Sequence, residues 1–255
     1  MTFHLRVLGC AFVLAVAVVQ RAAALDITAC GQSVPPYTSA TLTTDLACDD
    51  SASAVFVGEK GKLDFDGHSI SGGGIFCEAS CALTGPGTIE NVMPARPFGG
   101  ASAVFTARWY AKLAVKDLAI LGSKNGIYSN ASRVSLKNVV VSNNVDNGIT
   151  VFGKIVGRNV TTNDNGGVGV AAYNDTASVK MVGLTANGNG FGGLNCQGAR
   201  TVLSRSTLTA NSYPPFPDMP TAIDLVTATL PRLVETSCDH SWGPDGQPWG
   251  ICSGD

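Results

Sequence analysis

The sequence predicts an all-β fold, a right-handed parallel β-helix of about eight coils with three short strands in each coil. A motif recurs every 21 to 24 residues, and such self-similarity is typical of a solenoid. The repeats hold short β-rich runs and no stretch with the 3.6-residue period of a helix. Glycine occurs 30 times in 255 residues and only 14% of the residues are charged, a composition that suits many strands joined by tight turns.

The repeats are clearest in the second half of the chain. Four copies of a β-rich motif and one looser copy occupy 112–120, 133–141, 154–162, 178–186 and 200–210. An Asn- or Gly-rich turn and a short strand follow, as at 125–128 and 147–150. We expect stacked Leu, Val and Ile rows to form a continuous core, with each strand edge paired to the next coil.

One turn position recurs with a short polar residue. Asp117, Asn138 and Asn159 lie between the second and third strands of successive coils. This position needs a sharp bend, and Asn tolerates the left-handed backbone angles that provide it. We expect the side chains to point inward and to bond from coil to coil as a ladder.

The chain divides into four segments. Residues 1–24 form a signal peptide, with the apolar run Val7–Val19 before the small residues Ala22–Ala24. We expect an N-terminal cap at 25–58, the β-helix at 59–234 and a disulfide-closed tail at 235–255. Two segments, 94–110 and 213–220, are too long for simple turns and are predicted to protrude as loops.

Export to an oxidising compartment makes disulfides the expected state of the cysteines. Proximity in the sequence suggests Cys30–Cys48, Cys77–Cys81 and Cys238–Cys252, although connectivity does not follow from sequence alone. Cys196 is then left over and reads as a buried free thiol. We expect a secreted protein, extracellular or periplasmic, and a monomer.

Charge argues against two classes of partner. The formal net charge is −2, and removing 1–24 leaves 15 basic and 19 acidic residues, so nucleic-acid binding is not expected. The apolar run of the signal is too short to span a bilayer and no second long run follows it, so no membrane span is expected.

Two glycine-rich segments, Leu63–Gly72 and Leu83–Ile89, resemble secreted right-handed β-helix repeat proteins of the pectate-lyase-like superfamily. The resemblance covers about residues 60–212 and is specific for fold. This superfamily holds lyases, hydrolases, epimerases, esterases and non-catalytic surface proteins. The epimerase motif Tyr-Gly-x-Asp-Pro-His and the paired-aspartate motifs of polygalacturonases are absent here, which disfavours those activities.

The resemblance places a groove along the strand that follows the Asn-Gly turn. Strand alternation predicts that Ile127, Ile149 and Leu194 face inward. The outward and loop residues predicted to contact a substrate are Phe76, Trp109, Tyr110, Thr150, Asn195 and Asp224.

Elimination on a uronic acid polymer needs a group that neutralises the carboxylate, a base and an acid. Arg108 or Lys124 could neutralise the carboxylate, and Tyr128 or Tyr173 could act as base and acid, with Lys124 a competing base. Ca²⁺ is the one cofactor that the pattern raises. Three carboxylates in the turns could hold it: Asp146, Asp164 and Asp175. The alternative role of these aspartates is turn formation. His68 reads as a structural turn residue.

Three functions remain open at this point. The leading hypothesis is a polysaccharide lyase that cleaves an acidic, uronic-acid-containing polysaccharide by β-elimination. The alternative is a non-catalytic carbohydrate-binding or cell-surface module, which needs the exposed face but no base. The third is a purely structural scaffold.

Overall fold

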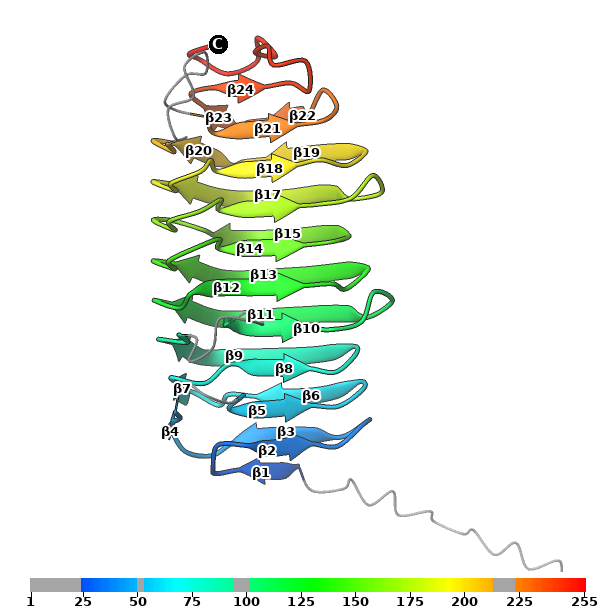
Figure 1. Cartoon of the computed structure of the whole chain (residues 1–255), viewed down its shortest axis with the longest axis vertical. Helices are drawn as coiled ribbons and strands as arrows, with labels where there is room; N and C mark the ends of the chain where they lie inside the picture. Colours follow the sequence, from blue (N-terminus) through cyan, green and yellow to red (C-terminus); the bar gives the residue numbers. More distant parts are fainter. Residues whose placement is uncertain (1–23, 50–52, 94–100, 213–222) are drawn as a thin grey trace, which may run out of the picture.

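The computed structural model describes residues 24–49, 53–93, 101–212 and 223–255. The described residues form a parallel β-solenoid of about eight turns and contain no helix, which confirms the predicted fold class. Figure 1 shows the coils stacked in chain order from β1 to β24, so that each coil contacts only its neighbours.

Ten short strands form the first sheet, called sheet B here. All its pairings are parallel. The strands are β2 (Gln32–Val34), β5 (Val55–Val57), β8 (Ile75–Cys77), β10 (Ser102–Thr106), β12 (Asn125–Ser129), β14 (Ile149–Val151), β16 (Val170–Ala172), β18 (Leu194–Cys196), β21 (Leu225–Thr227) and β24 (Ser241–Trp242).

The second sheet, sheet A, has fourteen strands and lies behind sheet B in Figure 1. Its main path is β1 (Leu25–Ile27), β3 (Ser39–Leu42), β6 (Gly61–Asp64), β9 (Cys81–Glu90), β11 (Lys112–Leu121), β13 (Arg133–Ser142), β15 (Lys154–Thr161), β17 (Ser178–Asn187), β19 (Arg200–Ser204) and β22 (Arg232–Val234). Four shorter strands pair beside it: β4 (Leu46–Ala47), β7 (Ser69–Ser71), β20 (Thr207–Thr209) and β23 (Ser237–Cys238).

Three long strands of sheet A, β11, β13 and β15, join the second and third runs expected for each coil, and each bends at one left-handed residue. Asp117, Asn138 and Asn159 have φ of 54°, 51° and 52°. Asn138 Nδ2 donates to Asp117 Oδ1 at 2.7 Å, and Asn159 Nδ2 donates to Asn138 Oδ1 at 3.0 Å, which confirms the ladder. The expected inward direction is wrong: Asn138 and Asn159 are exposed, and the residue that follows each of them, Val139 or Val160, enters the core instead.

The core follows from strand alternation. Ile127, Ile149 and Leu194 are each 0% exposed, so the predicted inward positions of sheet B are confirmed. Because Ile127 pairs with Ile149 in register and Ile149 with Val170, similar apolar side chains stack on one another along the helix. Each buried aliphatic side chain contributes about 1.5–3 kcal/mol of transfer free energy to folding.

The interior also holds a second ladder, of buried amides, that the sequence analysis missed. Asn144, Asn165, Asn189 and Asn211 are at most 2% exposed. The side-chain oxygen of each accepts the backbone N–H of the ladder residue one coil earlier, at 3.0 or 3.1 Å, the first such donor being Ser123. These residues precede sheet B strands, so the ladder satisfies polar backbone where the chain turns into the core.

Disulfides close both ends of the described stack as predicted. Cys30–Cys48, Cys77–Cys81 and Cys238–Cys252 are bonded, with Cα–Cα distances of 5.8, 6.0 and 5.0 Å, and Cys196 is a buried free thiol. Parallel pairing also continues into the segments expected to be cap and tail, since β2 pairs with β5 and β21 with β24.

The expected loop at 94–110 is wrong in its second half. Residues 94–100 lie outside the described residues, but Ser102–Thr106 forms β10, which pairs with β8 and β12 in sheet B. The alternation of Val104 and Phe105 was the signal for this strand, and Val104 is 0% exposed. The expected loop at 213–220 and the signal peptide, apart from residue 24, also lie outside the described residues. Within the described ranges, no helix is long and apolar enough to cross a bilayer.

Candidate functional site

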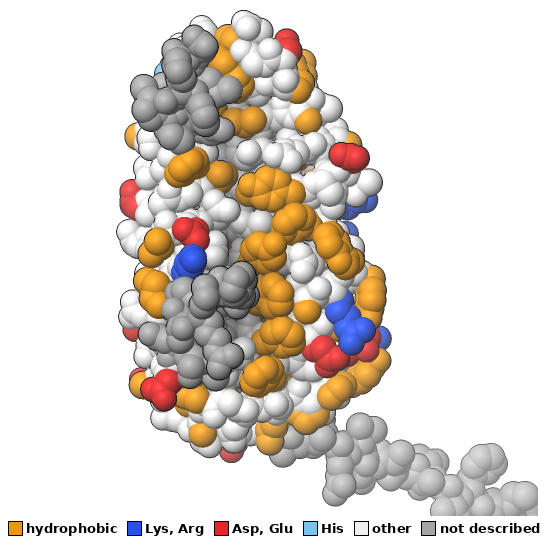
Figure 2. Space-filling view, viewed as in Figure 1, with side chains coloured by type: hydrophobic (Ala, Val, Ile, Leu, Met, Phe, Trp, Pro, Cys, Tyr) orange, Lys and Arg blue, Asp and Glu red, His pale blue; other side chains and the backbone are white. Residues whose placement is uncertain are grey.

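A column of aromatic side chains runs along the outer surface of sheet B. Five consecutive contacts with ring-centroid distances of 5.6 to 5.9 Å join Phe56, Phe76, Phe105, Tyr128, Phe152 and Tyr173. We call these six residues the aromatic column. Figure 2 shows hydrophobic side chains following this direction lengthwise along the viewed face of the solenoid.

The strand register produces the lower part of the column. Phe56 pairs with Phe76, Phe76 with Phe105 and Phe105 with Tyr128 at the same position of successive strands. At the next coil the ring comes from Phe152, two residues beyond the register partner Thr150. Because rings at these spacings attract one another beyond their buried area, the column stabilises the stack and keeps the outer surface of each ring in place.

Phe152 lies at the centre of the ring contacts. Its ring is 5.6 Å from the rings of both Tyr128 and Tyr173, and 5.9 Å from that of Trp109, which meets it edge-on at 75°. Trp109 is 63% exposed and lies beside the column through its contact with Phe152, and the next residue in the chain, Tyr110, is 67% exposed. Exposed aromatic surface next to a fixed apolar strip is typical of a binding site.

Arg108 lies in the turn that holds Trp109 and has two partners. Its Nη2 donates to Glu78 Oε1 at 3.0 Å, and its Nη1 donates to the Tyr110 hydroxyl oxygen at 2.8 Å. The hydrogen bond to Tyr110, followed by the one to Glu78, raises the pKa of Arg108 above its ordinary value. The guanidinium is therefore permanently charged and already paired with a carboxylate.

Lys124 lies at the other end of β12 from Tyr128. Its Nζ is 4.0 Å from Asp146 Oδ2, and the backbone N–H of Asp146 donates to the Lys124 carbonyl at 2.7 Å. The four residues predicted to be catalytic therefore form no single cluster. Tyr128 and Tyr173 meet around Phe152, while Arg108 and Lys124 each lie with a separate carboxylate.

The predicted substrate contacts divide into two groups. Phe76, Trp109 and Tyr110 lie on the outer surface as expected, with Phe76 half-buried within the column. Thr150 is not available: it is 3% exposed and accepts a hydrogen bond from Asn147 Nδ2 at 3.2 Å. Asn195 is partly buried, and its Oδ1 atom has no accessible surface.

Asp224 was predicted to face outward, and this is wrong. It is 0% exposed and ends the buried amide ladder. Its Oδ1 accepts from Asn211 Nδ2 at 2.6 Å and from Asn211 N at 3.3 Å, and its Oδ2 accepts from the backbone of Asp239 at 2.6 Å and of His240 at 3.2 Å. The residue precedes β21 instead of lying within it, so strand alternation did not apply to it.

The three aspartates predicted to hold Ca²⁺ do not come together as a ligand set. Within the described ranges, no group of three or more His, Cys, Asp or Glu side chains is arranged to hold a metal ion. Asp146 lies beside Lys124, and Asp164 and Asp175 occupy exposed turns, with φ of 55° at Asp164. This geometry fits their alternative role in turn formation.

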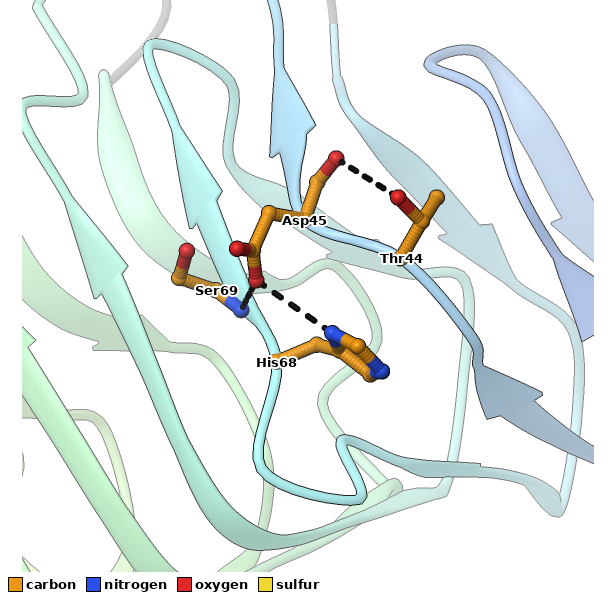
Figure 3. Close-up of polar contacts among 4 residues, drawn as sticks. All are labelled: Thr44, Asp45, His68 and Ser69. Carbon is orange, nitrogen blue, oxygen red and sulfur yellow. Dashed lines mark hydrogen bonds and ion pairs between the residues drawn. The ribbon is translucent and has the colours of Figure 1, made fainter.

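His68 contacts Asp45 at the start of the paired sheet A strands β4 and β7 (Figure 3). Asp45 Oδ1 accepts the Ser69 backbone N–H at 2.8 Å and lies 3.4 Å from His68 Nδ1. The bond from Ser69 is the main cause of a lowered pKa at Asp45. This arrangement links one coil to the next at a turn, which agrees with a structural role.

Three members of the column, Phe56, Phe105 and Phe152, were absent from the sequence prediction. Phe56 fell in the expected cap and Phe105 in the expected loop, while Phe152 lies at the end of its strand. Their signal was an aromatic residue at or near the outward position of a short strand in six consecutive coils. This pattern can be recognised only after the strand boundaries have been assigned correctly.

The chain matches no protein-family model, no curated protein and no solved structure. The function is therefore inferred from the geometry of the outer surfaces of the two sheets.

Proposed function

We propose that this protein is a non-catalytic carbohydrate-binding module that holds a polysaccharide chain lengthwise along the aromatic column. The observation that carries the proposal is the column itself, with the exposed Trp109 beside it. A parallel β-helix is compatible with carbohydrate-active proteins, and the three disulfides are compatible with an extracellular location. We include in this proposal the expectation that the chain is related to the pectate-lyase-like superfamily, which the sequence resembles.

The physical basis is the match between a repeating ligand and a repeating surface. Successive coils lie about 4.8 Å apart, so the column offers one aromatic side chain for each step along the axis. The C–H faces of sugar rings pack against aromatic surface, and hydroxyl groups remain free for solvent or for Tyr hydroxyls. A rigid scaffold also lowers the ordering cost of binding, because the rings are already held by their neighbours.

Binding is better supported than cleavage because of how the cations are paired. Arg108 is bonded to Glu78 and Lys124 lies beside Asp146, so each candidate for neutralising a substrate carboxylate has a carboxylate partner already. Both pairs are about half exposed, so displacing such a partner would cost up to about 1 kcal/mol of the binding free energy of the substrate.

A second candidate function, β-elimination on a uronic acid polymer, is favoured by one contact. The Arg108 guanidinium donates to the Tyr110 hydroxyl oxygen at 2.8 Å. This contact places a candidate base, the Tyr110 hydroxyl, beside a cation that could neutralise a substrate carboxylate. In this case Tyr110 would be the base in place of Tyr128 or Tyr173.

The two candidates separate in one set of measurements. Affinity electrophoresis in gels containing polygalacturonate, alginate or neutral β-glucan measures binding, and ultraviolet absorbance of unsaturated products measures elimination. We expect retarded migration in at least one gel with no absorbance change, and at least a tenfold weaker affinity in Trp109→Ala. Leu230→Ala removes an equally exposed apolar side chain from a different turn and should bind as the unchanged protein does.

An absorbance increase that is lost in Tyr110→Phe would replace the binding proposal with elimination. Equal migration of the Trp109→Ala and unchanged proteins in every gel would reject the aromatic column as the binding surface.

A further inference from the structure

The cations of the described chain gather on the outer surface of sheet A, on the strand halves that precede the left-handed bend. Ten exposed side chains share this face: Lys62, Lys112, Lys116, Arg133, Lys137, Lys154, Arg158, Lys180, Arg200 and Arg232. The net charge of −2 does not reveal this basic face, because the acidic residues that balance it lie mostly on other parts of the chain. The strands that carry these ten residues hold two acids, Asp64 in β6 and Asp117 at the bend of β11.

The strand register arranges six of these cations as two parallel rows, which we call the rails. The first rail is Lys112–Arg133–Lys154 and the second is Lys116–Lys137–Arg158, with one residue from each of β11, β13 and β15. Neighbours within a rail lie about 4.8 Å apart at the backbone. The rails are separated by four residues along the strands, which is about 13 Å.

Small side chains form the floor between the rails. Ala114, Ser135 and Val156 pair in register at the position midway between the two rows, and Ala82 continues the floor by one coil. Lys62 pairs with Ala82 at one end, and Lys180 pairs with Val156 at the other. A shallow hollow of about 330 Å³ lies at the Lys62 end, lined in part by Lys62, Lys112 and Arg133.

Folding does not explain this arrangement. Like charges directly opposite one another on neighbouring strands destabilise a sheet. The described residues provide one ion pair on the rails, Lys116 Nζ to Asp117 Oδ2 at 3.1 Å, and the other five rail cations have no carboxylate within 4.0 Å. A polyanion bound between the rails would relieve this repulsion.

We propose that the trough between the rails binds a linear sulfated glycan, which lies parallel to the solenoid axis. The floor is narrow and both walls are charged, which fits a single extended chain better than a flat bilayer. Each of the three central coils offers two cations, and one sugar unit advances by about one coil. The matching polymer therefore bears more than one anionic group per sugar, as sulfated glycans do and simple polyuronates do not. This site is on a different sheet from the aromatic column.

The test uses the full chain and a size-defined heparin oligosaccharide as the probe, measured by calorimetry over a series of salt concentrations. We expect the affinity to fall steeply as the salt concentration rises, because binding releases the counterions that are condensed on the polyanion. Arg133→Glu should bind at least tenfold more weakly, whereas Arg205→Glu, with the same charge change at an exposed corner, should change affinity less than twofold. Circular dichroism should be the same for both variants and the unchanged protein.

Competing polyanions decide the class of ligand. Polygalacturonate, single-stranded DNA and anionic vesicles should each bind at least tenfold more weakly than the heparin probe. Equal losses in Arg133→Glu and Arg205→Glu would overturn the trough as the site, and equal or tighter binding of any competitor would overturn the sulfated glycan. Trp109→Ala should leave heparin affinity unchanged, so failure of this proposal and failure of the aromatic column are distinguishable.

Discussion

Asn211 donates its side-chain amide to Asp224 at 2.6 Å, and both residues are buried to within 1% of full burial. This contact ends a file of amides that crosses four coils, each amide bonding to the next. The carboxylate oxygens of Asp224 also accept two backbone N–H groups from the tail beyond β23. Asp224 therefore ties the repeating stack to the disulfide-closed tail.

Replacing Asp224 by Ala should destabilise the protein strongly. The change leaves the donors of Asn211, Asp239 and His240 in a buried site without acceptors, and each unsatisfied group costs about 1–3 kcal/mol. We expect a loss of about 4 kcal/mol or more in the free energy of unfolding, measured by urea denaturation. A loss below about 1 kcal/mol would show that water or a shifted backbone satisfies these donors.

The two polar ladders should respond differently to mutation. Asn165→Ala removes a buried acceptor that bonds both the backbone and the amide of Asn144, so we expect a loss of about 3 kcal/mol and a melting temperature about 6–12 °C lower. Asn138→Gly removes exposed hydrogen bonds but suits a residue with φ of 51°, so the change should stay within about 1 kcal/mol. Equal melting temperatures for the two variants would contradict the assignment of the inner ladder to stability.

Phe152 should be the most important ring of the aromatic column for stability. Its replacement by Ala removes contacts with three rings, and since the side chain is half-buried we expect a loss of about 2 kcal/mol. Trp109→Ala removes one edge contact of an exposed side chain and should cost less than about 1 kcal/mol. Thermal melts of the two variants test this order, and the reverse order would place the structural centre of the column elsewhere.

Acid should loosen the C-terminal tail through Asp255. Burial raises the pKa of this carboxyl, but hydrogen bonds from Ser241 Oγ and from the backbone of Cys252, Ser241 and Ile251 outweigh it and lower the pKa. A lowered folded-state pKa means that the stabilisation is present above the unfolded value of about 3.9 and is lost as pH falls through the folded value.

Hydrogen exchange of residues 241–255 between pH 7 and pH 2.5 measures this effect. We expect protection to fall below about pH 4 in the unchanged protein. Asp255→Asn should already be less protected at pH 7 and should vary less with pH, whereas Asp175→Asn, at an exposed turn, should follow the unchanged protein. Identical profiles for all three proteins would show that Asp255 does not stabilise the tail.

Several features of the fold could be predicted because they depend on residues close together in the sequence. Inward Ile127 and Ile149 follow from strand alternation, and the bend at Asn138 follows from the local preference of Asn for left-handed angles. The pairing of Cys238 with Cys252 was suggested by their short separation of 14 residues. The prediction that Asp224 faces outward was wrong because this residue lies just before its strand. Burial at that position depends on the neighbouring coils and not on strand alternation.

The repeat alone determined that this chain folds as a stack of β coils, because a local period with alternating apolar residues has one way to bury its surface. Which side chains become neighbours across coils was decided only by the tertiary register. That register brings Phe152 to Trp109, sets Lys112 beside Arg133 and carries the Asn165 amide to Asn189. These contacts join residues 20 or more positions apart. A shift of one residue in the pairing would turn each of them to the opposite side of the sheet.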